Sequence, residues 1–389
     1  MILLNHWSMH KLLELDLNNK NLTIRVDMNV PIKNGIIVDQ TRIEACIPTI
    51  QKALDNNANV LLVSHLGRPE EGSYDKNLSL QPVAESLSKI FGLTVDLIKH
   101  LDDKSIFSGS SPIQILENIR FFDGEKSNSD NLGKVLAAMG DIYVFDAFGT
   151  SHREQASTHS AILNSRNACA GLLLEKEIDA LTKALNNSDS PYTAVIGGSK
   201  VSTKLELIKN INLKADYIIV GGGIANTFIK ASGYEVGQSL YEESMLDIAR
   251  SLLKDNKIML PKKVITSLSF EGENIQEKSI DDISKDEMIL DQFVTEDMKQ
   301  VLVNSNTILW NGPLGVFENK KFSNGTKDLS KIIASSNAFS LAGGGETLTA
   351  INNFIDKDDV SYCSTGGGAF LEFMEGKDLP SIAALKAKI

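Results

Sequence analysis

Few residues in this sequence are of the kinds that mark secreted or membrane proteins. The chain has three cysteines, at positions 46, 169 and 363, and no two of them form a Cys-x-x-Cys pair. Widely spaced cysteines in apolar surroundings are typical of buried free thiols in a reducing compartment. No apolar run approaches the length of a membrane span, and the N-terminal segment lacks the basic start and the cleavage site of a signal peptide. We therefore expect a cytoplasmic protein that binds no membrane.

Positive charge is also scarce. The formal net charge is −11, and only seven of the 39 basic residues are arginine. An acidic chain is a poor partner for nucleic acids, so any positive site must be local. The arginines are candidates for bidentate recognition of a small anion, because a guanidinium presents a planar fork of donors. Six of them lie in the first half of the chain, at positions 25, 42, 68, 120, 153 and 166.

Several common enzyme motifs are missing. The sequence contains no H-E-x-x-H, no G-x-S-x-G and no Cys/His metal spacing, which leaves zinc hydrolases and serine esterases without support. The segment 197–200 reads GGSK and does not match a Walker A loop. Asn226 stands where a G-x-G-x-x-G fingerprint would need its last glycine. P-loop NTPases and NAD-linked dehydrogenases are therefore disfavoured.

Glycine clusters are what the second half has in abundance. Three segments repeat one pattern, an apolar run followed by three glycines and a helical period, at 216–228, 338–351 and 360–373. A fourth, 192–206, has Ser199 in place of the third glycine and continues with Lys200. Glycines after a strand let the backbone turn sharply and bring bare N–H groups to a ligand, and a helix N-terminus attracts phosphate. One such cluster is often only a turn, but four at the same topological position favour a phosphate site.

The chain is long enough for two domains, and its apolar runs alternate with helical patterns, which predicts an α/β fold with buried parallel strands. We expect an N-terminal domain over 1–172, a joining helix and hinge over 173–188, and a C-terminal domain over 189–376, with the tail 377–389 docking back on the first domain. Helices are expected after Thr41, which would be the cap of the first one, over 78–92 with Ser79 as its cap, over 132–139 and over 171–186. Strands are expected at 22–28, 59–67, 113–121, 141–148, 192–196, 216–220, 258–266, 307–310, 338–342 and 360–364.

Charged residues in the first half cluster at the ends of predicted strands. Asp27 and Asn29 share one side of a strand by the two-residue period, and both could accept from a hydroxyl group. Convergent guanidinium forks at strand ends suit a small, multiply charged anion. Arg25 and Arg166 fit no such site, and we assign them to structure. The other candidates for anion recognition are Arg42, His65, Arg68, Arg120 and Arg153.

In the second half, Lys200 and Lys204 are four residues apart at a predicted helix start, where they would share a face. Like charges there oppose the helix dipole, unless a polyphosphate lies between them; an exposed lysine pair is the alternative. Glu318 follows another strand and is placed to accept from sugar hydroxyls. Glu346 follows a glycine cluster, where a carboxylate beside phosphates suits Mg²⁺.

Nine motifs occur in the order found in phosphoglycerate kinases, and from about residue 11 onward the chain resembles that family. The resemblance implies two Rossmann-like three-layer domains joined by a helix, a monomer, 3-phosphoglycerate or 1,3-bisphosphoglycerate on the first domain, and ADP or ATP with Mg²⁺ on the second. The motifs are RVDMNVP, SHLGRP, ENIRF, FDAFGTSHR, GGSKVSTK, GGGIANTF, NGPLGVFE, AGGGET and STGGGAF.

Residue by residue, the resemblance implies three groups of site residues. Phosphoglycerate would be held by Asp27, Asn29, Arg42, His65, Arg68, Arg120 and Arg153. The nucleotide would be held by Lys200, Lys204, Gly221, Gly222, Asn311, Gly312, Glu318, Gly344, Gly345, Glu346 and Thr347. The transferring phosphoryl group would be met by Arg42, Lys200, Gly344 and Gly367, with Gly366 and Gly367 opening a helix toward it.

Two features depart from the family's pattern. Glu346 stands where the family usually has aspartate, which puts the metal contact in question more than the phosphate contacts. Residues 1–8 extend beyond the family's usual start, which suggests Met9 as the initiator. The rival interpretations are a nucleotide-binding regulatory protein without catalysis, favoured only by Glu346, an NAD-linked dehydrogenase and a nucleic-acid-binding protein.

Overall fold

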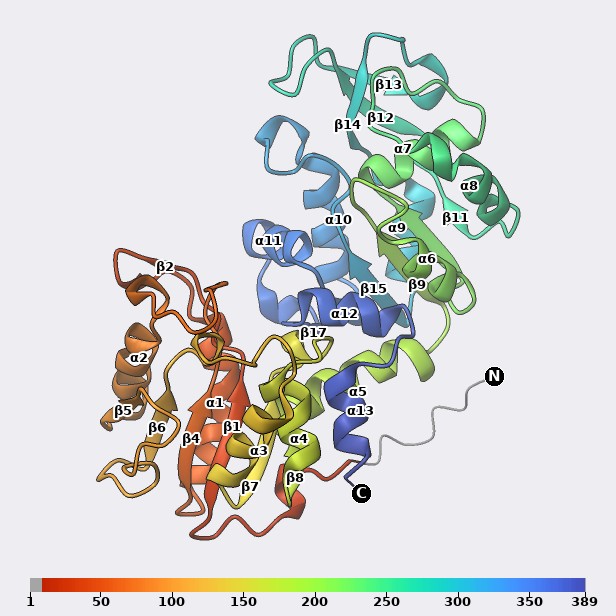
Figure 1. Cartoon of the computed structure of the whole chain (residues 1–389). Coiled ribbons are helices and arrows are strands. Elements are labelled where there is room, and N and C mark those ends of the chain that lie inside the picture. Colours follow the sequence, from red (N-terminus) through yellow and green to blue (C-terminus); the bar gives the residue numbers. More distant parts are fainter. Residues whose placement is uncertain (1–8, 389) are drawn as a thin grey trace. The chain divides into compact units, whose positions relative to one another are not determined.

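The computed structural model describes residues 9–388, so the predicted start at Met9 concerns residues outside the described range. The chain forms two compact units (Figure 1). One, the N-terminal unit, holds the chain up to Ile178 together with the segment from Asp378. The other, the C-terminal unit, is Asp179–Lys377. Helix α5 (Leu172–Asn186), predicted as the joining helix, contains the boundary between them.

The N-terminal unit is built on one six-stranded parallel sheet in the order β5-β6-β4-β1-β7-β8. From β1 the chain first forms the strands on one side of it, β4, β5 and β6, and then crosses over to form β7 and β8 on the other side. Since such crossovers are right-handed, the two branches carry their helices on opposite faces. Ligands of such sheets bind where the order reverses, here beside β1. The strands are β1 (Asn21–Val26), β4 (Asn59–Val63), β5 (Val95–Ile98), β6 (Ile113–Leu116), β7 (Ile142–Asp146) and β8 (Ala168–Ala170).

The helices of this unit follow the apolar period. In α1 (Thr41–Leu54), Ile43, Cys46 and Ile50 recur at helical spacing and are fully buried in the core. The helix α13 (Pro380–Lys386) packs against α4 (Ala161–Asn164), β8 and the π-helical turn Ala156–Ser160, and Ser381 N donates to Ser151 O at 3.1 Å. The other helices are α2 (Gln81–Phe91) and α3 (Asp130–Met139), and a hairpin pairs β2 (Ile32–Lys33) with β3 (Ile36–Ile37).

The C-terminal unit repeats the architecture with a second six-stranded parallel sheet, in the order β11-β10-β9-β15-β16-β17. Here the order reverses between β9 and β15. The strands are β9 (Tyr192–Ile196), β10 (Tyr217–Val220), β11 (Ile258–Met259), β15 (Thr307–Asn311), β16 (Phe339–Ala342) and β17 (Tyr362–Cys363). The helices are α6 (Leu205–Asn212), α7 (Gly222–Ala231), α8 (Leu246–Leu253), α9 (Glu296–Val303), α10 (Asn324–Ala334), α11 (Gly345–Phe354) and α12 (Gly367–Met374).

A small antiparallel sheet, β13-β12-β14, accompanies the large one in this unit (Figure 1). Its strands are β12 (Lys263–Ser267), β13 (Gln276–Ser279) and β14 (Met288–Gln292). The single strand predicted over 258–266 is therefore wrong. Pro261 interrupts it, and the two halves, β11 and β12, join different sheets, because proline cannot donate to a strand ladder.

The α/β class with parallel sheets is confirmed, whereas both predicted helix caps are wrong by one residue. Thr41 is the first residue of α1, and Gln40 is its cap. The cap of α2 is Leu80, and the Ser79 hydroxyl donates to Glu117 Oε2 at 2.7 Å and accepts from Gln81 N at 3.2 Å. Within residues 9–388, no helix combines the length and the apolar character that a membrane crossing requires.

Candidate functional site

The predicted anion-binding residues of the N-terminal unit follow the carboxyl ends of neighbouring parallel strands. Asp27 and Asn29 come directly after β1, and His65 and Arg68 after β4. Arg120 lies in the 3-10 turn that follows β6. Arg153 lies in the loop beyond β7, and Arg42 in the first turn of α1. The ends of these strands meet at one edge of the sheet, at its reversal point.

Asp27 and Arg42 form an ion pair at this edge. Arg42 Nη1 donates to Asp27 Oδ2 at 2.7 Å, and Asp27 is buried. Burial raises the pKa of the Asp27 carboxyl, but Arg42, His65 and Arg25 more than offset this and leave the pKa below its usual value. Asp27 is therefore a carboxylate at neutral pH.

His65 is held neutral at the same edge. It is 2% exposed, and burial lowers its pKa well below the usual value, with further lowering by Arg25, Arg120 and Arg153. Its Nδ1 atom lies 3.4 Å from Arg25 Nη2 and 3.9 Å from Asp27 Oδ1. Since a neutral imidazole has one donor and one acceptor nitrogen, an Nδ1 facing a guanidinium leaves Nε2 as the donor.

The arginines lie close enough to influence one another. The pKa of Arg120 is lowered to about 10, first by burial and then by Arg153, Arg25 and Arg68. The pKa of Arg153 is lowered by burial and then by Arg25, Arg68 and Arg42. Like charges held together in this way need an anion between them. We call Arg42, Arg68, Arg120 and Arg153 the arginine cluster.

The arginine cluster has few protein acceptors. Arg120 donates to Gly67 O, whereas its buried Nε has no partner among residues 9–388. Within the same described range, the side chains of Arg68 and Arg153 make no hydrogen bond or ion pair. Asn29 acts differently, because its Oδ1 accepts from Gly67 N at 2.9 Å and fixes the loop that carries Arg68.

Arg25, which the sequence assigned to structure, lies directly behind this edge. Its side chain is fully buried and donates to Ser157 Oγ at 2.8 Å and to Val26 O. Ser157 in turn donates to Glu125 Oε1 at 2.6 Å. Arg25 therefore belongs to the core and also contacts His65, which sequence period alone did not indicate.

The glycine clusters of the C-terminal unit also gather at the carboxyl ends of the strands. Gly197 follows β9, Gly312 follows β15, and these strands flank the reversal point. A Cβ on Gly197 would stand 1.8 Å from Pro313 O, so the two backbones touch. Gly312 has φ +111°, a conformation that side chains rarely adopt. Gly221, after β10, is also close to Pro313 O, which lies 2.6 Å from its ideal Cβ.

The side chain of Lys204 points into this edge of the sheet. Its Nζ donates to Gly197 O and, at 3.1 Å, to Asn311 O. Burial lowers its pKa to about 8, and Glu346 partly opposes the shift. The prediction that Lys200 and Lys204 share a helical face is wrong, since α6 begins at Leu205 and Lys200 lies in the turn before it. Lys200 is exposed, and its side chain has no partner among residues 9–388.

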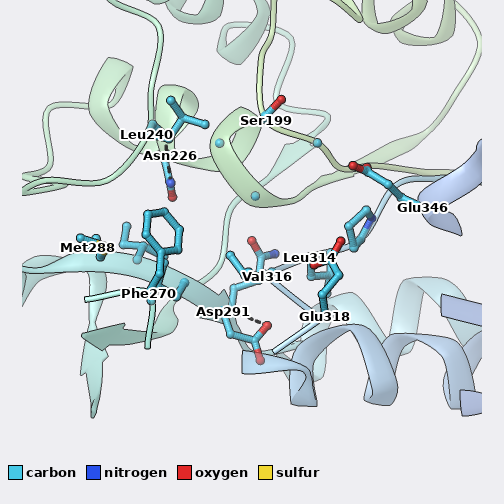
Figure 2. Close-up of a pocket in the computed structure, with 18 of the residues that line it drawn as sticks. Ser199, Asn226, Leu240, Phe270, Met288, Asp291, Leu314, Val316, Glu318 and Glu346 are labelled. Atoms are coloured by element: carbon cyan, nitrogen blue, oxygen red, sulfur yellow. Dashed lines mark hydrogen bonds between the residues drawn. The ribbon is translucent and has the colours of Figure 1, made fainter. Parts of the chain in front are cut away.

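A cavity of about 190 Å³ opens beside these strand ends (Figure 2). Gly222, Glu318 and Glu346 of the predicted set line it. Sequence reasoning missed its apolar wall, which comes from Leu240, Phe270, Met288, Leu314 and Val316. Phe270 is 57% exposed, and exposed aromatics at a polar edge favour a planar ligand. The signal was weak in the sequence because Phe270 lies in a loop of the small sheet.

The remaining glycines begin two helices. Gly344, with φ +96°, is the cap of α11, whose first turn contains Gly345, Glu346 and Thr347. Gly366 is the cap of α12, and an added Cβ on Gly367 would meet nothing within 4 Å, so its backbone is open to a ligand.

Thr347 and Asn311 hold this edge together through their side chains. Thr347 Oγ1 accepts from Gly312 N at 2.8 Å and donates to Gly343 O at 2.8 Å. Asn311 Nδ2 also donates to Gly343 O, at 2.7 Å, while its buried Oδ1 has no partner within residues 9–388. Their side chains therefore join β15 to β16.

Metal binding at this edge would depend on a bound phosphate-containing molecule that supplies further oxygen ligands. Residues 9–388 contain no group of three or more His, Cys, Asp or Glu side chains that could hold a metal ion. Glu346 is an exposed carboxylate on the rim of the cavity, at the N-terminus of α11. One carboxylate fits Mg²⁺ that arrives with phosphate oxygens and water, because Mg²⁺ keeps most of its other ligands.

Comparisons with known proteins agree with this geometry. The phosphoglycerate kinase family model matches residues 12–377. The phosphoglycerate kinase of Francisella tularensis subsp. novicida is 50% identical over 385 residues, covering 96% of this chain and 97% of its own. The structure of phosphoglycerate kinase from Coxiella burnetii has TM-score 0.92 and 44% identity, over 98% of this chain and 99% of its own. That from Pyrococcus horikoshii has TM-score 0.81 and 30% identity, with the same coverage.

Proposed function

The chain belongs to the phosphoglycerate kinase family, and from that premise we propose that its arginine cluster binds phosphoglycerate and its glycine-lined cavity binds the Mg-nucleotide. Membership gives the reaction itself. The enzyme transfers a phosphoryl group reversibly between 1,3-bisphosphoglycerate and ADP, forming 3-phosphoglycerate and ATP, as in glycolysis.

The observation that carries the assignment to the N-terminal unit is the scarcity of protein acceptors around the arginine cluster. Arg68 and Arg153 are unpartnered within residues 9–388, and Arg120 donates to one carbonyl only. Phosphate and carboxylate groups would supply the missing acceptors bidentately. Asp27, kept ionised by its surroundings, would accept from the substrate's hydroxyl group, and His65 would donate from Nε2.

The nucleotide assignment rests on the cavity and on the strand ends beside it. The apolar wall with Phe270 suits a base, and the rim carboxylate of Glu318 suits a ribose. Gly221, Gly222, Asn311, Gly312 and the N-terminus of α11 would face the phosphates with Lys204. Glu346 would hold Mg²⁺, which neutralises phosphate charge when bound.

The chemistry requires no general base. When 3-phosphoglycerate attacks ATP, the nucleophile is a carboxylate, whose pKa of about 3.5 leaves it ionised at neutral pH. The protein's task is then to align the reacting groups and to stabilise charge on the transferring phosphoryl group. We assign that role to Lys200, Arg42, the backbone of Gly344 at the N-terminus of α11 and the open backbone of Gly367.

Transfer would also need motion, because the two proposed sites belong to different units. Closure of the units would bring the substrates in line and exclude water. The segment 173–188, most of which is α5, would carry the hinge. A monomeric state and a cytoplasmic location remain predictions, the first open to light scattering of the purified chain.

A coupled spectrophotometric assay tests the proposal. Mg-ATP and 3-phosphoglycerate would be supplied, with glyceraldehyde-3-phosphate dehydrogenase consuming the product and oxidising NADH. We expect turnover that needs both substrates and Mg²⁺, and a loss of at least about 1,000-fold in Lys200→Ala, because it removes charge aimed at the transferring group. Lys209→Ala is the matched control, since Lys209 is an exposed lysine paired with Glu206 on α6.

Calorimetry separates the outcomes. Lys200→Ala should bind 3-phosphoglycerate as the wild type does, and a lost affinity would contradict the division of roles. A wild-type chain that binds both substrates without turnover would favour the non-catalytic nucleotide-binding protein and point to Glu346 or to failed closure.

A further inference from the structure

A buried carboxylate lies beneath one wall of the cavity. Asp291, near the end of β14, is 2% exposed and lines the cavity beside Leu314 and Val316 (Figure 2). No catalytic step described above uses it. Burying a charge is costly unless hydrogen bonds compensate, so its contacts indicate what it does.

Asp291 joins β14 to the N-terminus of α10. Its Oδ2 accepts from Gly325 N at 2.9 Å and its Oδ1 from Gln292 N at 2.9 Å. The residue that caps α10, Ser323, makes no side-chain cap hydrogen bond. The carboxylate of Asp291 therefore takes the place of the local cap and meets the positive end of the helix.

The same contact fixes the loop that carries Glu318. This loop, residues 312–323, leads from β15 into α10, and its middle is held by Val316 N donating to Leu290 O at 2.8 Å. Leu314 N donates to Thr326 Oγ1, in the first turn of α10, at 3.1 Å. Asp291 also packs against the loop directly, because a Cβ on Gly315 would stand 2.4 Å from Asp291 Oδ1.

We propose that Asp291 is a positioning residue for the nucleotide, holding α10 and the loop 312–323 so that Leu314, Val316 and Glu318 form a fixed wall of the cavity. The proposal rests on the nucleotide assignment made above and adds a residue that acts through α10 and the loop 312–323. A loosened wall would weaken nucleotide binding while leaving phosphoglycerate binding unchanged.

The ionisation of Asp291 gives the proposal a second readout. The pKa of Asp291 is raised to about 7, mainly by burial and in smaller part by Asp328 on α10, while the N–H groups of Gly325, Gln292 and Asn324 oppose the rise. The loop segment 312–317 contains no titratable side chain, and Ile265 is the residue opposite Asp291 on β12. Because the N–H donors prefer the carboxylate, nucleotide affinity should rise with pH through about 7.

Calorimetry with the full-length chain tests this. In Asp291→Asn, an amide of the same shape, we expect the Kd for MgADP to rise about ten-fold, with the Kd for 3-phosphoglycerate unchanged. The Kd of this variant for MgADP should depend less on pH near 7 than the Kd of the wild type does. Because both proteins are measured with the same ligand, the ionisation of ADP itself cancels in the comparison. Lys331→Gln is the matched control, because Lys331 is an exposed residue on the same helix and should keep the wild-type Kd.

Thr326→Val is the second variant, since it removes only the acceptor of Leu314 N. If Asp291→Asn does not fold cooperatively, a selective loss of MgADP affinity in Thr326→Val supports the proposal, and wild-type affinity there overturns it. A folded Asp291→Asn that binds MgADP normally, or that loses both ligands equally, also overturns it. Wild-type chain that fails to bind MgADP would instead sink the nucleotide assignment itself.

Discussion

The two units share one architecture and differ in what they place at the ends of their strands. The N-terminal unit presents side chains there, forked guanidinium groups around a buried carboxylate and a neutral histidine. The C-terminal unit presents mostly backbone, with glycines after four of its six parallel strands in the large sheet and three more after a fifth. The same position, where the strand order reverses, can therefore suit a small anion when it carries charged side chains, or a polyphosphate when it carries backbone N–H groups.

The difference follows from the size of the proposed ligands. A three-carbon acid has little surface, so its recognition must come from charge and hydrogen-bond geometry. A nucleotide brings a base and a ribose that an apolar wall can hold, which leaves the phosphates to N–H groups and one or two lysines. Each unit should thus respond to its own kind of perturbation.

Removing one guanidinium from the arginine cluster should give the largest effect. In Arg153→Ala we expect the Kd for 3-phosphoglycerate to rise about 100-fold, because charge-assisted hydrogen bonds to phosphate or carboxylate are lost. MgADP affinity should not change. Arg250→Ala is the control, since Arg250 is an exposed arginine paired with Asp247 in the other unit. Equal losses for both ligands, measured by calorimetry, would break the comparison.

A change of pH should separate the units next. Lys204 has a pKa of about 8, whereas Arg120 keeps its proton up to about 10. Nucleotide phosphates need Lys204 charged, so the Kd for MgADP should rise about ten-fold from pH 7 to pH 9, while the Kd for 3-phosphoglycerate stays level. Lys204→Met should abolish this rise in Kd and leave only the fall in Kd through about pH 7 that is expected from Asp291. A level MgADP profile in the wild type would mean that Lys204 does not contact phosphate.

The smallest expected effect concerns the backbone framework of the C-terminal unit. Thr347→Val removes the acceptor of Gly312 N and should lower the free energy of unfolding by about 1 kcal/mol. Thr349→Val is the matched control, because the Thr349 hydroxyl is exposed and bonds only to Gly345 O within its own helix. Denaturant unfolding of both variants gives the comparison, and equal losses would show that the buried bond is not special.

Strand ends were the most predictable part of the molecule. Apolar runs of four to six residues followed by glycine marked β9, β10, β15 and β16 to within a residue or two, because burial on both faces of a parallel sheet leaves a continuous apolar signal. The arginine cluster followed from the same strand ends. The small antiparallel sheet was missed, since its half-exposed strands carry polar residues such as Lys263 and Glu277.

Contacts between segments that are distant in the sequence could not be predicted from it. Lys200 and Lys204 looked like one helical face, yet Lys204 turns inward to two carbonyls and α6 starts after it. The position of Arg25 within a strand can be read from the sequence. Its hydrogen bond to Ser157 cannot, because the two residues are 132 positions apart. Asp291 likewise gives no local signal, because the N–H group that it accepts from belongs to a later helix.

The route of the chain has a consequence for how the protein is made. Helix α13 follows the C-terminal unit in the sequence and packs on α4, and Lys388 Nζ donates to Leu163 O at 3.0 Å, so a segment that is synthesised after the C-terminal unit completes the first unit. The C-terminal unit, Asp179–Lys377, is thus an uninterrupted insertion. On the ribosome, the C-terminal unit can therefore fold before the N-terminal unit is complete, because domains fold as their residues emerge.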